Sequence, residues 1–301
     1  MRIAPLPYSL GAEILDLDLT KPTSAEDTIN LIKAYNFHML LLFRNQMIND
    51  DHLINLAKLF GEIKLPPAAH ERASIQKSNT REEITVVSNV KIDGIPIGEL
   101  GDGEVIWHSD YSFKEVIGGM RVLHGIKIPP SIAGGKTEFS NMYLAFDELS
   151  IDLKNYVYSK KIKHDIAYDT NRALRIGAKP IDDPRKGTGP IHPIVSSHPE
   201  TNCNSLFLGR RLAHYVIGES LTNSEKVLDT LWEHSTQEKY IYRHEWQQND
   251  VVLWDNRCTI HRRTPFDASY DRILHAAQVE GHKPYESIDS RNLLPHPRGL
   301  S

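Results

Sequence analysis

The segment Val251-Val-Leu-Trp-Asp-Asn-Arg-Cys-Thr-Ile-His261 decides the fold class that the sequence predicts. Its apolar start, Val251 to Trp254, is typical of a buried β-strand. The strand runs into a polar turn and then into a histidine, a residue type that binds metals. We therefore ask whether the rest of the chain also predicts buried strands, and whether other metal-binding residues accompany His261.

Most of the chain after about residue 84 has the pattern of short strands. Scattered Pro and Gly act as turn punctuation, and the loops at 198–204 and 247–250 are rich in turn-forming residues. The segments that predict strands are Ile84–Val90, Val105–His108, Arg121–Ile128, Ile194–Ser197, Ser205–Leu208, Tyr240–Trp246, Val251–Trp254 and Arg272–Val279. The apolar run Met39–Phe43 predicts a further buried strand.

Four helices are expected to flank these strands. One begins at Ser24 and another after Asn49, the latter stopping at Gly61, and two more lie at Met142–Leu149 and Ser224–His234, with Ser224 as a cap. The residues expected to face a core are Ile29, Ile32 and Tyr35, then Leu53, Leu56 and Phe60, then Val227, Leu228 and Leu231. A mostly β core with flanking helices predicts a sandwich or jelly-roll barrel.

Composition limits the partners and the organisation of the chain. Its 301 residues, 40% of them hydrophobic, are enough for a single domain over 1–301. A net charge of −4 gives no reason to expect nucleic acid or an anionic membrane as partner. No apolar run approaches the roughly 18–20 residues of a membrane span, and two cysteines make no disulfide framework, so we expect a cytoplasmic protein. A homo-oligomer is possible, because nothing in the sequence decides the oligomeric state.

The motif Trp107-His108-Ser109-Asp110 is the sharpest local feature. In a strand, alternate residues point to the same side, so a strand ending in His-x-Asp would place an imidazole and a carboxylate together. Alone, this motif is weak evidence for a metal, since it often occurs by chance. With His261, about 150 residues later, it completes a set of two imidazoles and one carboxylate, which leaves three positions open on Fe(II). Arg272, eleven residues further, supplies a planar fork suited to a carboxylate.

Taken in order, these motifs resemble the taurine dioxygenase and 2,4-dichlorophenoxyacetate dioxygenase family. The resemblance rests on His-x-Asp, Gly134-Gly135-Lys136-Thr137, Trp254-Asp255-Asn256-Arg257 leading to His261, and Arg272. It extends to the opening of the chain, where Leu41–Gln46 precedes a helix that ends in Phe60-Gly61-Glu62.

The resemblance implies a fold, a cofactor set and a reaction. The fold would be a double-stranded β-helix, a jelly-roll barrel with the metal at its mouth. His108, Asp110 and His261 would bind Fe(II), and Thr137 and Arg272 would hold the far carboxylate of 2-oxoglutarate. The enzyme would use O₂ to hydroxylate, and possibly thereby cleave, a small-molecule substrate, with release of succinate and CO₂. Because the carboxylate ligand is present, we favour hydroxylation over halogenation, with desaturation and ring closure as alternatives.

The chain departs from the family pattern around the substrate. The family's cation four positions after Arg272 is replaced by Ala276, a histidine by Pro66, and an asparagine by Glu104. Each lost charge-assisted contact costs about 1.5–3 kcal/mol, so we do not expect taurine as substrate. Tyr111 and Phe113 are expected to line the substrate side, with Ala276 leaving room for a bulkier group. Glu104 is a candidate for binding an amine or hydroxyl.

Several residues are compatible with more than one role. Arg257 would either contact the C1 carboxylate of 2-oxoglutarate or pair with Asp255. The pair Arg210-Arg211 would face the site mouth or lie solvated on the surface. His70, His124 and His275 are expected to be structural, Trp254 to pack in the core, and Cys258 to be inert.

Two other functions compete with the dioxygenase. A hydrolase or isomerase could hold Zn²⁺ on the same triad, but this would leave Arg272 and Thr137 without a role. A binding protein that had lost activity would be expected to have lost a ligand or the arginine.

Overall fold

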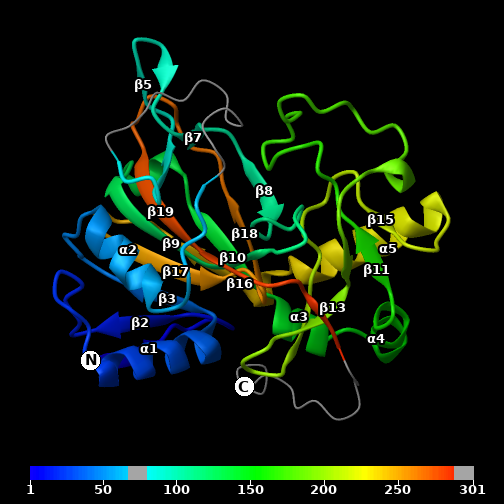
Figure 1. The fold of residues 1–301 in the computed structure, drawn as a ribbon, viewed down its shortest axis with the longest axis horizontal. Coiled ribbons are helices and arrows are strands. Elements are labelled where there is room, and N and C mark those ends of the chain that lie inside the picture. Colours follow the sequence, from blue (N-terminus) through cyan, green and yellow to red (C-terminus); the bar gives the residue numbers. More distant parts are fainter. Residues whose placement is uncertain (67–79, 288–301) are drawn as a thin grey trace.

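The computed structural model describes residues 1–66 and 80–287 and is mostly β with few helices, as predicted (Figure 1). Its largest sheet has eight strands. In spatial order these are β1 (Arg2–Pro5), β2 (Ala12–Leu15), β3 (Leu40–Phe43), β17 (Val251–Asp255), β9 (Gly118–Lys127), β19 (Ile273–Glu280), β4 (Thr85–Ser88) and β7 (Glu99–Leu100).

A second sheet of four strands carries the other half of the core. In spatial order its strands are β16 (Ile241–His244), β10 (Thr137–Asn141), β18 (Thr259–Arg263) and β8 (Val105–His108). Smaller sheets are formed by β12 (Ile191–Pro193), β11 (Lys161–Lys163) and β15 (Tyr215–Val216), by β14 (Asn204–Leu206), β13 (Val195–Ser197) and β20 (Tyr285–Glu286), and by β5 (Lys91–Ile92) and β6 (Ile95–Pro96).

Alternation along the strands explains why the largest sheet is apolar on both faces. In β3, Leu41 and Phe43 join the core beneath the N-terminal helices, whereas Leu40 and Leu42 join the core between the two sheets. The two sheets meet at Phe139 of β10 and Trp254 of β17, whose ring centroids lie 5.1 Å apart. Each fully buried Leu or Phe side chain contributes about 1.5–3 kcal/mol, so the sheet is stabilised from both sides.

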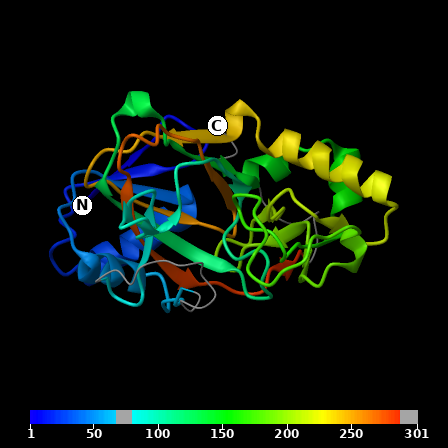
Figure 2. The ribbon, with the colours of Figure 1, turned by 90° about the horizontal axis from the view of Figure 1, so that it is seen from above.

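Helices cover the two ends of this arrangement. They are α1 (Ala25–His38), α2 (Asp50–Lys58), α3 (Met142–Asp147), α4 (Ile151–Val157) and α5 (Leu221–Ser235). Figures 1 and 2 show α1 and α2 beside the eight-stranded sheet and α3, α4 and α5 at the opposite end. No helix among the residues described here is long and apolar enough to cross a membrane.

The predicted helix starts are confirmed for α1 and α2. Ser24 accepts from the backbone N–H of Asp27, and Asn49 forms a capping box with His52. Of the three α1 residues predicted to face the core, Tyr35 is buried, but Ile29 and Ile32 are 54% and 36% exposed. Leu31, Ala34 and His38 are buried beside Tyr35.

Other boundaries also differ from the prediction. The α5 cap is Ser220 rather than Ser224, and Ser224 lies one turn inside, where its hydroxyl accepts from the Val216 N–H at 2.9 Å. Helix α2 ends at Lys58, before Gly61, and α4 was not predicted. The polar turn predicted after Val251–Trp254 lies at residues 256–258, and His261 follows it within strand β18 (Thr259–Arg263).

Candidate metal centre

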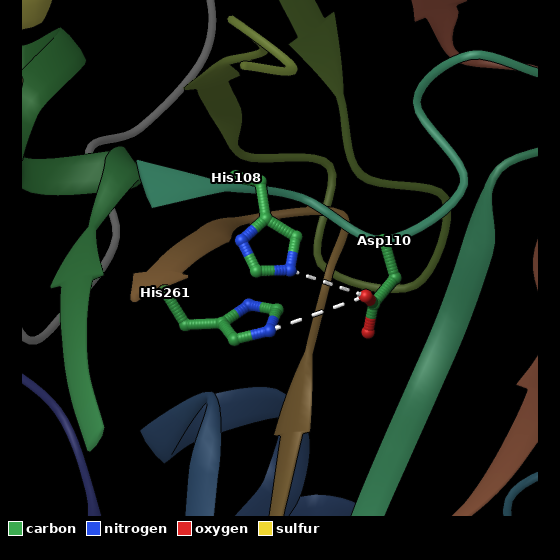
Figure 3. Close-up of side chains that lie close together, drawn as sticks. All are labelled: His108, Asp110 and His261. Atoms are coloured by element: carbon green, nitrogen blue, oxygen red, sulfur yellow. Dashed lines mark ion pairs between the residues drawn. The ribbon is translucent and has the colours of Figure 1, made fainter. Parts of the chain in front are cut away.

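Three side chains from separate parts of the chain converge between the two sheets. Figure 3 shows His108, Asp110 and His261 pointing toward one another. The Nε2 atoms of His108 and His261 lie 3.5 Å and 4.0 Å from Asp110 Oδ1. One donor atom from each residue lies within 4.8 Å of the other two, so a single ion could bind all three.

Strand pairing brings the two histidines together. In the antiparallel register of β18 and β8, His261 lies opposite His108. The Nδ1–H of His108 donates to the carbonyl of Ile106 at 2.7 Å, which leaves the Nε2 lone pair directed at the cluster. Strand pairing thus determines the position of His108, and a backbone hydrogen bond determines its tautomer.

Asp110 is positioned by a different device. Strand β8 ends at His108, so strand alternation does not place Asp110, which lies in the turn that follows. Asn256 holds this turn. Its side-chain oxygen accepts from the Asp110 N–H at 3.2 Å, and its carbonyl accepts from the Ser109 hydroxyl at 2.6 Å. The Asn256 amide nitrogen in turn donates to the Gly119 carbonyl at 2.9 Å.

Electrostatics favour the metal-binding forms of His261 and Asp110. Burial and the neighbouring His108 hold the pKa of His261 well below its ordinary value, so this imidazole is neutral. Burial would raise the pKa of Asp110, but Arg121 and the two histidines outweigh it and hold that pKa far below its usual range. Arg121, whose Nη1 lies 3.5 Å from Asp110 Oδ2, was not anticipated from the sequence.

The donor set fits a divalent metal. Among the described residues, Asp110 Oδ2 is buried without a hydrogen-bond partner. Buried polar atoms normally have partners, and those without one call for an explanation such as a ligand. Two imidazole nitrogens and one carboxylate oxygen match the ligand preference of non-haem Fe(II) sites.

A second group of potential ligands, His198, Asp255 and Cys258, is already satisfied internally. Asp255 accepts from His198 Nε2 at 3.0 Å and from Arg257 at 2.7 Å and 2.8 Å. Arg257 also donates to Glu200 at 2.8 Å, so its guanidinium is bound to two carboxylates. Burial raises the pKa of the Cys258 thiol, which agrees with the expectation of an inert residue.

Arg272 is a buried cation for which the described part of the chain provides no counter-ion. It is 2% exposed, and its guanidinium makes no ion pair or hydrogen bond with any residue in the described ranges. Burial, and then the like charge of Arg263, lower its pKa from 12.5 to about 9. Arg263 is also buried, but it donates to the carbonyls of Leu100 and Gly101 at 2.9 Å each.

The Gly134-Gly135 turn brings Thr137 into this region. Gly135 has a φ of +78°, which L side chains rarely adopt, and a Cβ there would lie only 3.3 Å from the Phe266 Cβ, so glycine is favoured beside Arg272. Thr137 is 4% exposed and accepts from Trp246 Nε1 at 2.9 Å. Trp246 and Arg272 line the same small cavity.

The four expected substrate residues are not gathered at one point. The rings of Tyr111 and Phe113 stack at 5.9 Å, and Phe113 and Glu104 both line a cavity of about 1490 Å³. Glu104 is 3.9 Å from Arg172. Ala276 is 1% exposed and lies in the apolar core between the two sheets.

The two neighbouring arginines have different environments. Arg210 is buried, donates to the Asp165 carbonyl at 2.8 Å and lies 5.3 Å from the centroid of the Phe113 ring. Arg211 pairs at the surface with Glu225 and Asp229. His275 pairs with Asp50 at 2.6 Å, and His124 is buried. Trp254 packs in the core as expected, 4.7 Å from the His261 ring. His70 lies outside the described residues.

Comparison with known proteins supports what this geometry indicates. Residues 2–278 match the model of the family described as "Taurine catabolism dioxygenase TauD, TfdA family". The chain is 32% identical over 291 residues to the (S)-phenoxypropionate/alpha-ketoglutarate-dioxygenase of Sphingobium herbicidovorans, covering 95% of this chain and 96% of that protein. It is 30% identical over 288 residues to the alpha-ketoglutarate-dependent 2,4-dichlorophenoxyacetate dioxygenase of Cupriavidus pinatubonensis, covering 91% and 95%.

A solved structure agrees with these relatives. The crystal structure of AAD-2 in complex with Mn(II) and N-oxalylglycine superposes with a TM-score of 0.75 at 28% identity, covering 94% of this chain and 99% of that one. Family match, relatives and fold lead to one conclusion: the chain belongs to the TauD/TfdA family and is an enzyme of the 2-oxoglutarate-dependent (alpha-ketoglutarate-dependent) dioxygenase class.

Proposed function

We propose that this enzyme binds Fe(II) at His108, Asp110 and His261 and hydroxylates a small organic substrate other than taurine. The balanced reaction is R–H + 2-oxoglutarate + O₂ → R–OH + succinate + CO₂. The substrate and the decarboxylated co-substrate each lose two electrons, and O₂ accepts all four. Fe(II), when bound, supplies the activation of O₂ that this reaction requires.

The unpaired guanidinium of Arg272 carries the proposal. A buried charge normally has a partner, because leaving water costs several kcal/mol per ion. The described residues provide no anion for Arg272, although they provide partners for the equally buried Asp255. A ligand carboxylate would pair with the Arg272 guanidinium and neutralise its charge. A dicarboxylate such as 2-oxoglutarate would then have a second carboxylate free to bind the metal.

The other residues of the chain orient and enclose this co-substrate. Thr137, already an acceptor for Trp246, has its own hydroxyl hydrogen to donate to the carboxylate on Arg272. Arg257 is assigned a positioning role, since its donors are bound by Asp255 and Glu200. Through Asp255 it fixes the loop that contains Asn256, the residue that holds Asp110.

We further propose that the two sheets form a jelly-roll barrel within one domain over 1–301. The shared core between β10 and β17, and the metal cluster at its edge, support this arrangement. Tyr111 and Phe113 would offer aromatic surface to the substrate, and Ala276 would add no charge to it.

An anaerobic titration with Fe(II) and 2-oxoglutarate tests the proposal. The proposed chelate gives a weak visible charge-transfer band, which should appear with the wild-type protein. Arg272→Ala should weaken it severely. Arg262→Ala is a matched control, because the Arg262 guanidinium is bound to Glu138 at 2.6 Å and is not expected to affect the band. A colourless wild-type mixture would refute the proposal and favour a hydrolase or isomerase.

A screen by succinate release would then identify the substrate. The panel should contain aryloxyalkanoates, amino acids, sulfonates and sulfate esters. Taurine turnover as fast as that of any other compound would contradict the part of the proposal that excludes taurine.

A further inference from the structure

Arg121 of β9 is a cation inside the protein whose hydrogen-bonding capacity is largely unused. Strand alternation puts it on the same face as Leu123, which belongs to the core between the sheets, whereas Met120 and Val122 face the N-terminal helices. Its side chain is 15% exposed. It therefore points toward the metal centre and not toward bulk solvent.

The one ion pair of Arg121 within the described ranges is loose. Nη1 lies 3.5 Å from Asp110 Oδ2, and the guanidinium makes no hydrogen bond to any described residue. A guanidinium has five N–H donors. Some polar side-chain atoms of the described residues are buried from solvent and also lack a hydrogen-bond partner, but no nitrogen of Arg121 is one of them. The Arg121 donors therefore border solvent-accessible space.

The neighbouring strand leaves room beside Arg121. In the register of β9 and β19, Arg121 lies opposite Gln278, and Ala276 lies opposite Leu123. Ala276 contributes only a methyl group, so the β19 side has no large side chain at this diagonal position, whereas on the β17 side Trp254 lies opposite Arg121. Gln278 is 5% exposed, and its Oε1 is buried without a hydrogen-bond partner among the described residues.

We propose that Arg121 is a specificity-determining residue that binds the acidic group of the substrate, so that the enzyme prefers organic anions to their neutral counterparts. The inference rests on the proposed function. It also follows from a charge count. A divalent ion, Asp110 and Arg121 together carry +2, and the metal-bound end of 2-oxoglutarate reduces this to +1. One positive charge is then left for a monoanionic substrate, since the far carboxylate of 2-oxoglutarate pairs with Arg272.

Equilibrium binding tests the inference without turnover. Under nitrogen, with Fe(II) and 2-oxoglutarate present, phenoxyacetate and 2-phenoxyethanol are titrated by calorimetry. The two probes share the ring and the ether and differ in the carboxylate. The wild-type protein should bind the acid at least about 10-fold tighter than the alcohol, because a hydrogen bond to a charged group is worth about 1.5–3 kcal/mol.

Three variants separate recognition from other effects. Arg121→Gln should weaken the acid roughly 10- to 100-fold and remove the preference, while Arg121→Lys, which keeps the charge, should retain part of it. Arg262→Gln changes the net charge equally, but Arg262 pairs with Glu138 at the outer side of β18, so the preference should persist. Circular dichroism checks that Arg121→Gln is folded, and Arg121→Lys carries the test if it is not.

The opposing outcomes are also defined. If Arg121 only orients Asp110, its variants will lose Fe(II) affinity and bind both probes equally more weakly, which overturns the inference. Failure of the wild-type protein to bind the acid, or to prefer it, overturns it as well. The visible chelate band is independent of both probes, so its presence would leave the proposed function standing.

Discussion

Replacing Arg272 by Met should stabilise the protein without 2-oxoglutarate and abolish its response to that ligand. The pKa of Arg272 is lowered from 12.5 to about 9 by burial and by Arg263, so the folded state disfavours the charged form. At about 1.4 kcal/mol per pH unit, this difference corresponds to about 5 kcal/mol of opposition to folding. This free-energy cost to folding applies in full below pH 9 and decreases as the pH rises from 9 toward 12.5.

The expected gain is smaller than this figure, because solvent and the surrounding dipoles relax around a buried charge. Replacing buried ionic groups by apolar ones of similar volume stabilises proteins by about 1–4 kcal/mol. We expect Arg272→Met to gain an amount in that range in urea unfolding at pH 7.5 without co-substrate. At 100 times the dissociation constant, 2-oxoglutarate should add about 2.7 kcal/mol to the wild-type protein and nothing to the variant.

Arg263→Met is the matched control. Arg263 is also buried and cationic, but both of its Nη atoms donate to backbone carbonyls, including those of Leu100 and Gly101. The same substitution there would remove these hydrogen bonds to a charged group, at about 1.5–3 kcal/mol each, and should destabilise the protein. A loss of stability in Arg272→Met without ligand, or a retained response to 2-oxoglutarate, would refute the reasoning.

Three further predictions concern other sites. His261→Ala should abolish Fe(II) binding measured by anaerobic titration, whereas His275→Ala, which removes a partner of Asp50, should retain it; equal losses would contradict the assigned centre. Thr137→Val should raise the dissociation constant of 2-oxoglutarate roughly 10-fold or more, measured from the visible band, and an unchanged constant would exclude Thr137 from the carboxylate site. Burial lowers the pKa of His164, His192 and His214, so each should contribute stability above pH 6.5 that is lost as the pH falls, by up to about 1.4 kcal/mol per pH unit. His164→Phe should flatten this slope in urea unfolding by about one proton, and an unchanged slope would show that His164 is protonated in the folded state.

Strands buried on both faces could be predicted from the sequence. The run Leu40–Phe43 is apolar throughout because alternate residues enter two different cores. Strand alternation also applies at β9, where Arg121 interrupts the apolar residues Met120, Val122 and Leu123. A charge with the same parity as Leu123 must point into the core between the sheets, and that signal would have identified Arg121.

Helix faces and starts were harder to predict for a physical reason. In α1, one stripe contains Ile29 and Ile32 and a neighbouring stripe contains Leu31 and Tyr35, and periodicity does not decide between them. The sheet decides, because it contacts only the second stripe. At α5, Ser220 and Ser224 are both possible caps, and the difference is a tertiary hydrogen bond from Val216 to Ser224.

The candidate site was predictable as a set of residues but not as a geometry. The spacing of the motifs identified His108, Asp110 and His261, yet the reason given for Asp110 was strand alternation, and the strand ends two residues earlier. The long-range contact from Asn256 performs that task. Arg257 had two possible roles in the sequence, and its contacts with Asp255 and Glu200 are visible only after folding.

The contrast between satisfied and unsatisfied buried charges is the strongest physical argument for a ligand. At comparable depth, Asp255 is held by His198 and Arg257, and Arg263 is held by backbone carbonyls. The fold is therefore able to provide partners for interior charges. It provides no anion from the described residues for the Arg272 guanidinium, and it leaves Asp110 Oδ2 without a hydrogen bond. Because a buried charged group without a partner opposes folding, these two groups are best explained by ligands that complete them: a carboxylate on Arg272 and a cation on the triad.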